Sequence, residues 1–218
     1  MFDINNILFS IGGNGVSLIE LLSVLSGLTC VILAGRNNKY NFWAGYIYNI
    51  LLFSLFIQKN LYSAMLLQPV AFGINAYGHW RWTHPKKGEE SPTKKNELKI
   101  SALTWKERGT GTIIVLTLSL LWGVVLSKLG RDWFIGIFQP DPSPYIDAFA
   151  LMLTLSAQFV SALKKWDCWF IWLFVNIINI ILYIGSGLVF MPIVSALFLI
   201  NGIWALLTWH KIYKKENL

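Results

Sequence analysis

Uncharged amide and aromatic side chains recur at helical spacing inside the most apolar parts of this chain. Trp172, Asn176, Asn179 and Tyr183 are spaced 0, 4, 7 and 11 residues, which predicts one stripe along a single face of an α-helix. Amides both donate and accept hydrogen bonds, and aromatic rings stack on flat ligands. The stripe therefore predicts a binding surface for a planar, polar organic molecule.

Related groups occur in three other apolar segments. They are Gln68, Phe72, Asn75 and His79, again at 0, 4, 7 and 11; Asn201, Trp204 and Thr208 at 0, 3 and 7; and Asn49, with Gly45 one turn before it. Polar groups inside membrane helices are costly, so they usually point into the helix bundle or a wet cavity. Trp172 and Trp204 are expected to sandwich a ring, with about 2 kcal/mol per face if the ring is cationic and desolvated.

The predicted substrate-binding set combines these stripes. It consists of Trp172, Asn176, Gln68, Asn179, Asn75, Asn49, Tyr183, Asn201, Trp204 and Phe72. No carboxylate or histidine lies in the middle of these segments, so no metal ligand, cofactor or catalytic residue is expected. The alternative is that the amides only join helices, through interhelical hydrogen bonds of about 0.6–2 kcal/mol. For one asparagine the two interpretations are equally favoured, whereas a stripe of four favours the cavity.

The composition shows which elements must position these groups. Of the 218 residues, 55% are hydrophobic and only 13% charged, about half the charge of a soluble domain. The apolar residues cluster into runs near the length that crosses a hydrocarbon core of about 30 Å. The fold class predicted is therefore all-α integral membrane, with seven transmembrane helices: Ser17–Ala34, Asn41–Ile57, Leu61–Trp82, Thr110–Leu129, Pro144–Leu163, Asp167–Gly187 and Phe190–Trp209.

The chain is also duplicated. A shift of 127 residues lays the last third over the first without a gap, and matches Asn49 with Asn176 and Trp82 with Trp209. Three spans are an odd number, so the fourth span re-inverts the chain and both copies point the same way. This predicts two parallel three-helix repeats joined by a linker helix, as in many transporters. The predicted domains are a first repeat with its loop (1–109), a linker helix with an outer loop (110–143) and a second repeat (144–218).

Basic residues set the orientation. Fifteen of the 18 Lys and Arg residues lie on one side of the predicted membrane and three on the other. The positive-inside rule then places the N-terminus outside and the C-terminus in the cytoplasm. Because the formal charge of +7 is explained by these loops, no nucleic-acid partner is expected.

The loop 84–108 contains Pro, Gly, Ser and mixed charge, which predicts a mobile linker. Its last part, from Leu98 to Trp105, is expected to lie as an interfacial helix on the lipid. Tryptophans at the predicted cytoplasmic ends of spans are expected to form an interfacial belt: Trp80, Trp82, Trp105, Trp166 and Trp209.

Glu20 and Asp147 are acids matched by the 127-residue shift, each near the N-terminal end of its span. A carboxylate there is stabilised by the helix dipole, so structural capping is the favoured interpretation. The other interpretation is an outer vestibule that attracts a cationic ligand.

The layout of three, one and three spans, with KKWDCWFIWLFVNIINIILYIGSGL in the sixth span and YGHWRW at the end of the third, resembles the PnuC family of bacterial vitamin transporters. The resemblance covers essentially the whole chain. Its most specific element is the run of Trp169, Trp172, Asn176 and Tyr183.

The resemblance implies an architecture similar to the SWEET sugar transporters and transport of nicotinamide riboside down its gradient. It places Trp172, Asn176 and Gln68 in the substrate site. It also implies a homotrimer in the lipid of the bacterial inner membrane, and capture of the product by a separate cytoplasmic kinase without direct contact. Related proteins carry thiamine or other vitamins, and many have an acidic residue where this chain has Asn176.

Three alternatives compete with a uniporter for nicotinamide riboside. One is the same scaffold carrying another vitamin, such as thiamine. A membrane enzyme would need paired carboxylates or a histidine cluster near the interface, and the sequence has neither pattern. The third alternative is a membrane scaffold that transports nothing, and such a protein would not need the aligned polar stripes.

Overall fold

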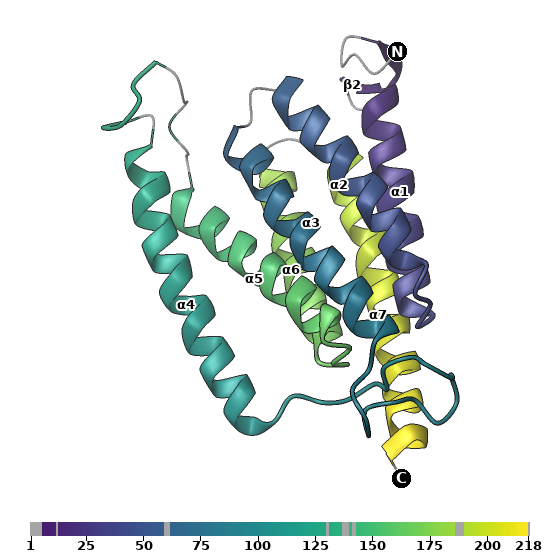
Figure 1. The fold of residues 1–218 in the computed structure, drawn as a ribbon. Coiled ribbons are helices and arrows are strands. Elements are labelled where there is room, and N and C mark those ends of the chain that lie inside the picture. Colours follow the sequence, from purple (N-terminus) through teal and green to yellow (C-terminus); the bar gives the residue numbers. More distant parts are fainter. Residues whose placement is uncertain are drawn as a thin grey trace.

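The computed structural model describes residues 6–11, 13–58, 62–129, 131–136, 140, 143–185 and 190–217. Figure 1 shows a helical protein with its termini at opposite ends of the bundle. The elements in chain order are β1 (Ile7–Ile11), β2 (Asn14–Ser17), α1 (Leu18–Gly35), α2 (Asn41–Gln58), α3 (Tyr62–Thr83), α4 (Trp105–Lys128), α5 (Pro144–Ala162), α6 (Cys168–Gly185) and α7 (Phe190–Asn217).

The predicted helices are all present among the described residues, with two changes at their ends. The fourth begins at Trp105 rather than Thr110, because Thr104 and Glu107 form a capping box that satisfies the first backbone N–H groups. The last continues to Asn217 instead of ending at Trp209. The antiparallel hairpin β1–β2 was not predicted, and it leads directly into α1 through Ser17, the N-cap of that helix.

In the part of the chain that the structure describes, four helices are long and apolar enough to cross a membrane by length and composition: α1, α4, α5 and the part of α7 from Met191. The described part of α6 is apolar but shorter. In each of the four membrane-span candidates most residues are not buried within the chain, as expected for helices that face lipid.

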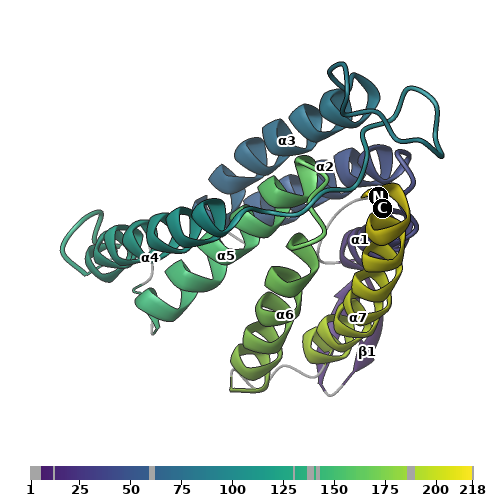
Figure 2. The same ribbon diagram turned by 90° about the horizontal axis from the view of Figure 1, so that it is seen from below.

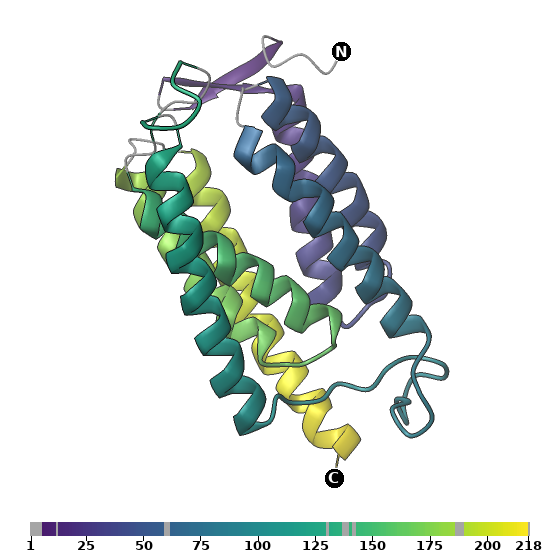
Figure 3. The same ribbon diagram turned by 60° about the vertical axis from the view of Figure 1, so that its left-hand side comes forward.

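The helices pack into a ring, which Figure 2 shows from below. Successive helices pack together from α1 to α3 and from α4 to α7, and two contacts join distant parts of the chain: α1 lies against α7, and α3 lies against α5. In Figure 3 α1, α2 and α3 stand as one group, with α5, α6 and α7 on the other side. Helix α4 packs on α5 at the outside of the ring.

An aromatic core closes the end of the ring near the C-terminus. The indole N–H of Trp82 donates to the carbonyl oxygen of Ser161 at 3.2 Å, and that of Trp209 donates to Ala34 at 3.0 Å. Their side chains are 1% and 0% exposed. The prediction that these two tryptophans belong to an interfacial belt was wrong, because each indole is used to join two helices. Trp80 and Trp105 are exposed, as a belt requires.

The segment 89–101, which we call the strap, packs on this aromatic core. Leu98 and Ile100 are 4% and 0% exposed and belong to the same cluster as Trp82 and Trp209. The predicted interfacial helix from Leu98 to Trp105 is therefore wrong. Leu98 and Ile100 alternate with polar residues, and this period of two fits an extended segment whose apolar side chains point inward.

Hydrogen bonds hold the strap against four parts of the bundle, which also corrects the expectation of a mobile linker. Leu98 N–H donates to Trp82 O at 3.0 Å and Ser101 N–H to Lys164 O at 3.1 Å. Ile100 N–H donates to the Glu216 carboxylate at 3.0 Å, and Lys94 donates to the Asn37 carbonyl oxygen. The strap thus connects α3, the α5–α6 turn, α7 and the α1–α2 turn.

Candidate functional site

A cavity of about 430 Å³ lies between the helices, with walls from α1, α2, α3, α5, α6 and α7. The structure brings seven of the ten predicted residues together in its lining: Gln68, Asn75, Asn49, Trp172, Asn176, Asn179 and Asn201. These residues come from four helices, so the stripes predicted on separate helices face one common space.

Three predicted residues are placed differently. Trp204 is 44% exposed and packs beside Gly35 of α1, outside the cavity lining, so the predicted sandwich with Trp172 is wrong. Phe72 is 39% exposed and its ring lies 5.0 Å from that of Tyr46, also outside the lining. The Tyr183 side chain lies outside the described residues.

Some of the predicted amides already hold helices together. Asn75 donates its side-chain N–H to Phe42 O at 3.0 Å, and Asn201 donates to Val31 O at 3.0 Å. These bonds join α3 to α2 and α7 to α1. The two interpretations offered by the sequence therefore both apply, because these amides join helices and line the cavity at once.

Two donors in the cavity wall have no hydrogen-bond partner among the described residues. They are the side-chain nitrogen of Asn49 and the indole nitrogen of Trp169. Both residues are buried, with exposed fractions of 6% and 3%. A buried donor without a partner costs about 1–3 kcal/mol, so an acceptor oxygen that reaches either group would be stabilising.

Asn176 lies beside Trp172 in the same wall. It is 4% exposed, and its side-chain nitrogen donates to Trp172 O at 2.8 Å, one turn earlier in α6. This bond fixes the amide orientation, and a carboxamide has further donor and acceptor capacity for a ligand.

The sequence prediction missed a stripe on α5. Thr154, Gln158 and Ser161 line the cavity at spacings of 0, 4 and 7. Gln158 donates to Ala71 O at 3.2 Å and so joins α5 to α3. The signal was available, because the spacing is the one that identified the other stripes, but the segment has only one amide.

The described lining of this central cavity contains no charged side chain. In the described part of the chain no three His, Cys, Asp or Glu residues stand close enough to hold a metal ion. The wall can therefore offer a ligand hydrogen bonds and aromatic surface. Apolar helices around such a cavity define a membrane protein with space for a small polar solute inside the bundle.

Comparison with known proteins then identifies the family. Residues 17–211 match the family described as nicotinamide mononucleotide transporter, and the chain belongs to this family of membrane transporters, which are not enzymes. The chain is 28% identical over 201 residues to the nicotinamide riboside transporter PnuC of Escherichia coli, covering 85% of this chain and 84% of the relative. It is 24% identical over 204 residues to the protein of the same name from Haemophilus influenzae, covering 92% and 83%.

A solved structure has the same fold. The crystal structure of the vitamin B3 transporter PnuC superposes with a TM-score of 0.67 at 19% sequence identity, covering 91% of this chain and 83% of that one. The bacterial relatives and the apolar helices together make this a multi-pass protein of a bacterial membrane.

Proposed function

We propose that this protein is a uniporter that carries nicotinamide riboside across the bacterial inner membrane by facilitated diffusion and so supplies NAD synthesis. The observation that carries the proposal is the uncharged central cavity, with the Trp172 indole and the two unpartnered donors of Asn49 and Trp169 in its wall. Nicotinamide riboside has a flat cationic ring, a carboxamide and ribose hydroxyls. The indole suits the ring, and the two donors suit its oxygens. The names of the two relatives support the same substrate.

The phosphorylated substrate named in the family description is expected to be rejected. A phosphate needs charge-assisted hydrogen bonds, usually from Arg or Lys, and the described lining of the central cavity contains neither. Proton coupling is not part of the proposal, because proton-coupled carriers use acidic residues within the membrane and this lining has none.

The proposed architecture is a pair of parallel three-helix repeats, 1–109 and 144–218, with residues 110–143 as the linker. All seven helices would then span the membrane. Two hydrogen bonds support the duplication. Trp82 of the first repeat donates to Ser161 of the second, and Trp209 of the second donates to Ala34 of the first. The two donors are matched by the shift of 127 residues, and so are the two acceptors. Helix α6 also begins and ends 127 residues after α2 begins and ends.

The proposed orientation has the N-terminus outside and the C-terminus in the cytoplasm. It is supported by the position of the basic α3–α4 loop at the same end of the bundle as the C-terminus in Figure 1. We also propose a homotrimer. The exposed side chains of α4, including Ile113, Leu120 and Leu121, offer an apolar surface to lipid or to a neighbouring copy. A separate cytoplasmic kinase would trap the product without contacting the transporter.

Calorimetric binding to detergent-purified protein tests the substrate. Nicotinamide riboside is expected to bind, whereas thiamine and nicotinamide mononucleotide are expected to compete weakly or not at all. Uptake into liposomes that lack any kinase tests the mechanism, since a uniporter continues to equilibrate substrate when an uncoupler is added. Tighter binding of thiamine, or transport of the mononucleotide, would contradict the proposal.

A further inference from the structure

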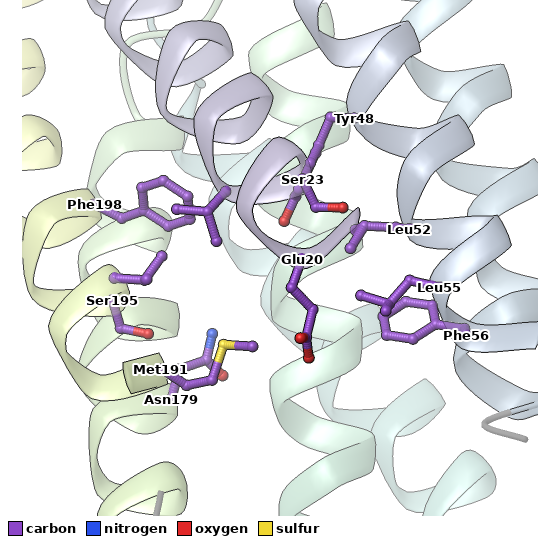
Figure 4. A pocket seen from close by; sticks show the side chains of 12 residues that line it. Glu20, Ser23, Tyr48, Leu52, Leu55, Phe56, Asn179, Met191, Ser195 and Phe198 are labelled. Carbon is purple, nitrogen blue, oxygen red and sulfur yellow. The ribbon is translucent and has the colours of Figure 1, made fainter. Parts of the chain in front are cut away.

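A second cavity lies at the end of the bundle where α1 begins. Its volume is about 210 Å³, and α1, α2, α6 and α7 supply its walls (Figure 4). It shares Tyr48, Leu52, Phe56, Asn179 and Phe198 with the central cavity. The side chains between a solute in this outer cavity and the central cavity are therefore ones that line both cavities.

Glu20 brings a negative charge into this space. Its side chain points between Leu55 and Met191 in Figure 4, and the residue is 8% exposed. Among the described residues that line the two cavities, Glu20 has the only charged side chain. A charge in apolar surroundings is costly, so its position beside the central cavity requires an explanation.

The capping role of Glu20 explains how the carboxylate is held. Glu20 Oε2 accepts hydrogen bonds from the Ser17 backbone N–H and from the Ser17 hydroxyl, both at 2.8 Å. The Ser17 hydroxyl oxygen in turn accepts the Glu20 backbone N–H at 3.4 Å. These bonds and the positive end of the α1 dipole stabilise the anion. They do not explain why the carboxylate lines a cavity, because glutamine fills the same position of a capping box equally well.

The matched acid of the second repeat is placed differently. Asp147 is half-buried in the first turn of α5, and it is outside the described lining of both cavities. The N-cap of that helix, Ser143, makes no side-chain capping bond. Among the described residues, the charge in the outer cavity thus comes from Glu20 in α1 and not from its matched acid.

We propose that the Glu20 cavity is an outer selectivity site, which admits organic solutes carrying a fixed positive charge on a flat ring and discriminates against neutral and anionic ones. The proposal deepens the proposed function and rests on it. The carboxylate attracts the cation, and the rings of Phe56 and Phe198 and the phenol of Tyr48 provide aromatic surface along the walls. Asn179, which lines both cavities, offers a polar group at the passage to the central site.

The variant Glu20→Gln tests this inference, because it removes the charge and preserves the capping box. Uptake of nicotinamide riboside and of its reduced form, dihydronicotinamide riboside, is measured in liposomes. The two solutes have nearly the same shape, but the reduced ring is uncharged. The wild-type protein is expected to prefer the cation. The variant is expected to raise the KM for the cation by about tenfold, as expected for one partly desolvated charge pair, and to leave the KM for the neutral form unchanged.

Two control variants separate charge from folding. Asp147→Asn removes the matched acid and is expected to keep the preference for the cation. Ser17→Ala weakens the cap but retains the carboxylate, so it is expected to lower the melting temperature and keep the preference. Equal KM changes for both solutes in Glu20→Gln, or no change for either, would overturn the selectivity site while leaving the proposed function intact. Failure of the wild-type protein to take up nicotinamide riboside would overturn both.

Discussion

The side-chain amide of Asn75 in α3 packs directly on Gly45 in α2. Its nitrogen lies 2.7 Å from the point where a Cβ on Gly45 would stand, and its oxygen lies 3.0 Å from that point. The same nitrogen donates to Phe42 O. Under the 127-residue shift Gly45 matches Trp172, so the two matched positions carry different side chains. One side of the cavity presents an indole and the other a glycine covered by an amide.

Substitution of Gly45 by alanine is expected to destabilise the protein. The added Cβ displaces the Asn75 amide and breaks its hydrogen bond to Phe42, which costs about 1–3 kcal/mol. Thermal unfolding in detergent measures the effect. Gly73→Ala is the matched control in α3, because nothing lies within 4 Å of its Cβ position and alanine favours a helix. An equal loss in both variants would show that the Asn75 contact is not responsible.

Removal of the Trp172 indole is expected to weaken binding of nicotinamide riboside by about 1–3 kcal/mol, the value for one stacked face. Trp204→Ala is expected to have little effect on affinity, because Trp204 lies outside the cavity lining. Calorimetry on both variants distinguishes the two residues. A similar loss of affinity in Trp204→Ala would restore the two-sided sandwich that the sequence suggested.

Replacement of Asn49 by leucine is expected to weaken ligand binding without lowering the stability of the protein. The side-chain nitrogen of Asn49 is buried without a partner among the described residues, so an apolar side chain of similar size removes a desolvation cost of about 1–3 kcal/mol. The melting temperature is expected to stay constant or rise. Affinity for nicotinamide riboside is expected to fall about tenfold or more, because a ligand oxygen loses its donor. A variant that melts earlier and binds normally would assign Asn49 to helix packing alone.

The buried Lys164 is expected to make stability depend on pH. Its side chain is 0% exposed, and its Nζ lies 4.5 Å from the centre of the Trp82 ring and 3.8 Å from Glu97 Oε2. Burial lowers the pKa of Lys164 from 10.5 to about 8, against the opposing effect of Glu97. Below pH 8 the folded and unfolded states are both protonated, so the cost of the buried charge is fully present.

As the pH rises from 8 towards 10.5, the folded state releases the proton first, and the free energy of unfolding increases by up to ~3 kcal/mol. Lys164→Met is expected to remove this part of the pH dependence, measured by chemical unfolding in detergent. Lys165→Met is the control, since Lys165 is only half-buried and donates to Ala102 O at 3.0 Å. The same slope in wild type and Lys164→Met would contradict the expectation.

The helices and the polar stripes were readable from the sequence because both depend on short-range periodicity. A helix fixes which residues share a face, so Gln68 with Asn75, and Asn176 with Asn179, were expected to act together, and the structure places them in one cavity lining. Helical spacing does not determine how much of each helix face remains uncovered by the neighbouring helices. For this reason Phe72 and Trp204, only one turn from predicted residues that line the cavity, lie outside the lining.

The strap shows what residue composition alone does not predict. Its charged and small residues are typical of a solvated linker, and contacts with Asn37, Trp82, Lys164 and Glu216 make it part of the folded end of the bundle. Trp82 and Trp209 were assigned to the lipid interface for a similar reason, because position at a helix end does not reveal a partner across the bundle.

The positions of the helices and the uncharged character of the predicted site follow from local pattern and residue type, so both could be read from the chain alone. Which side chains share one space became known from the packing of the helices. Glu20 lines a cavity and Asp147 does not, Trp204 is outside the lining that contains Trp172, and Gln158 is part of the wall. These outcomes depend on contacts between helices far apart in the chain, for which the spacing of residues along one helix contains no information.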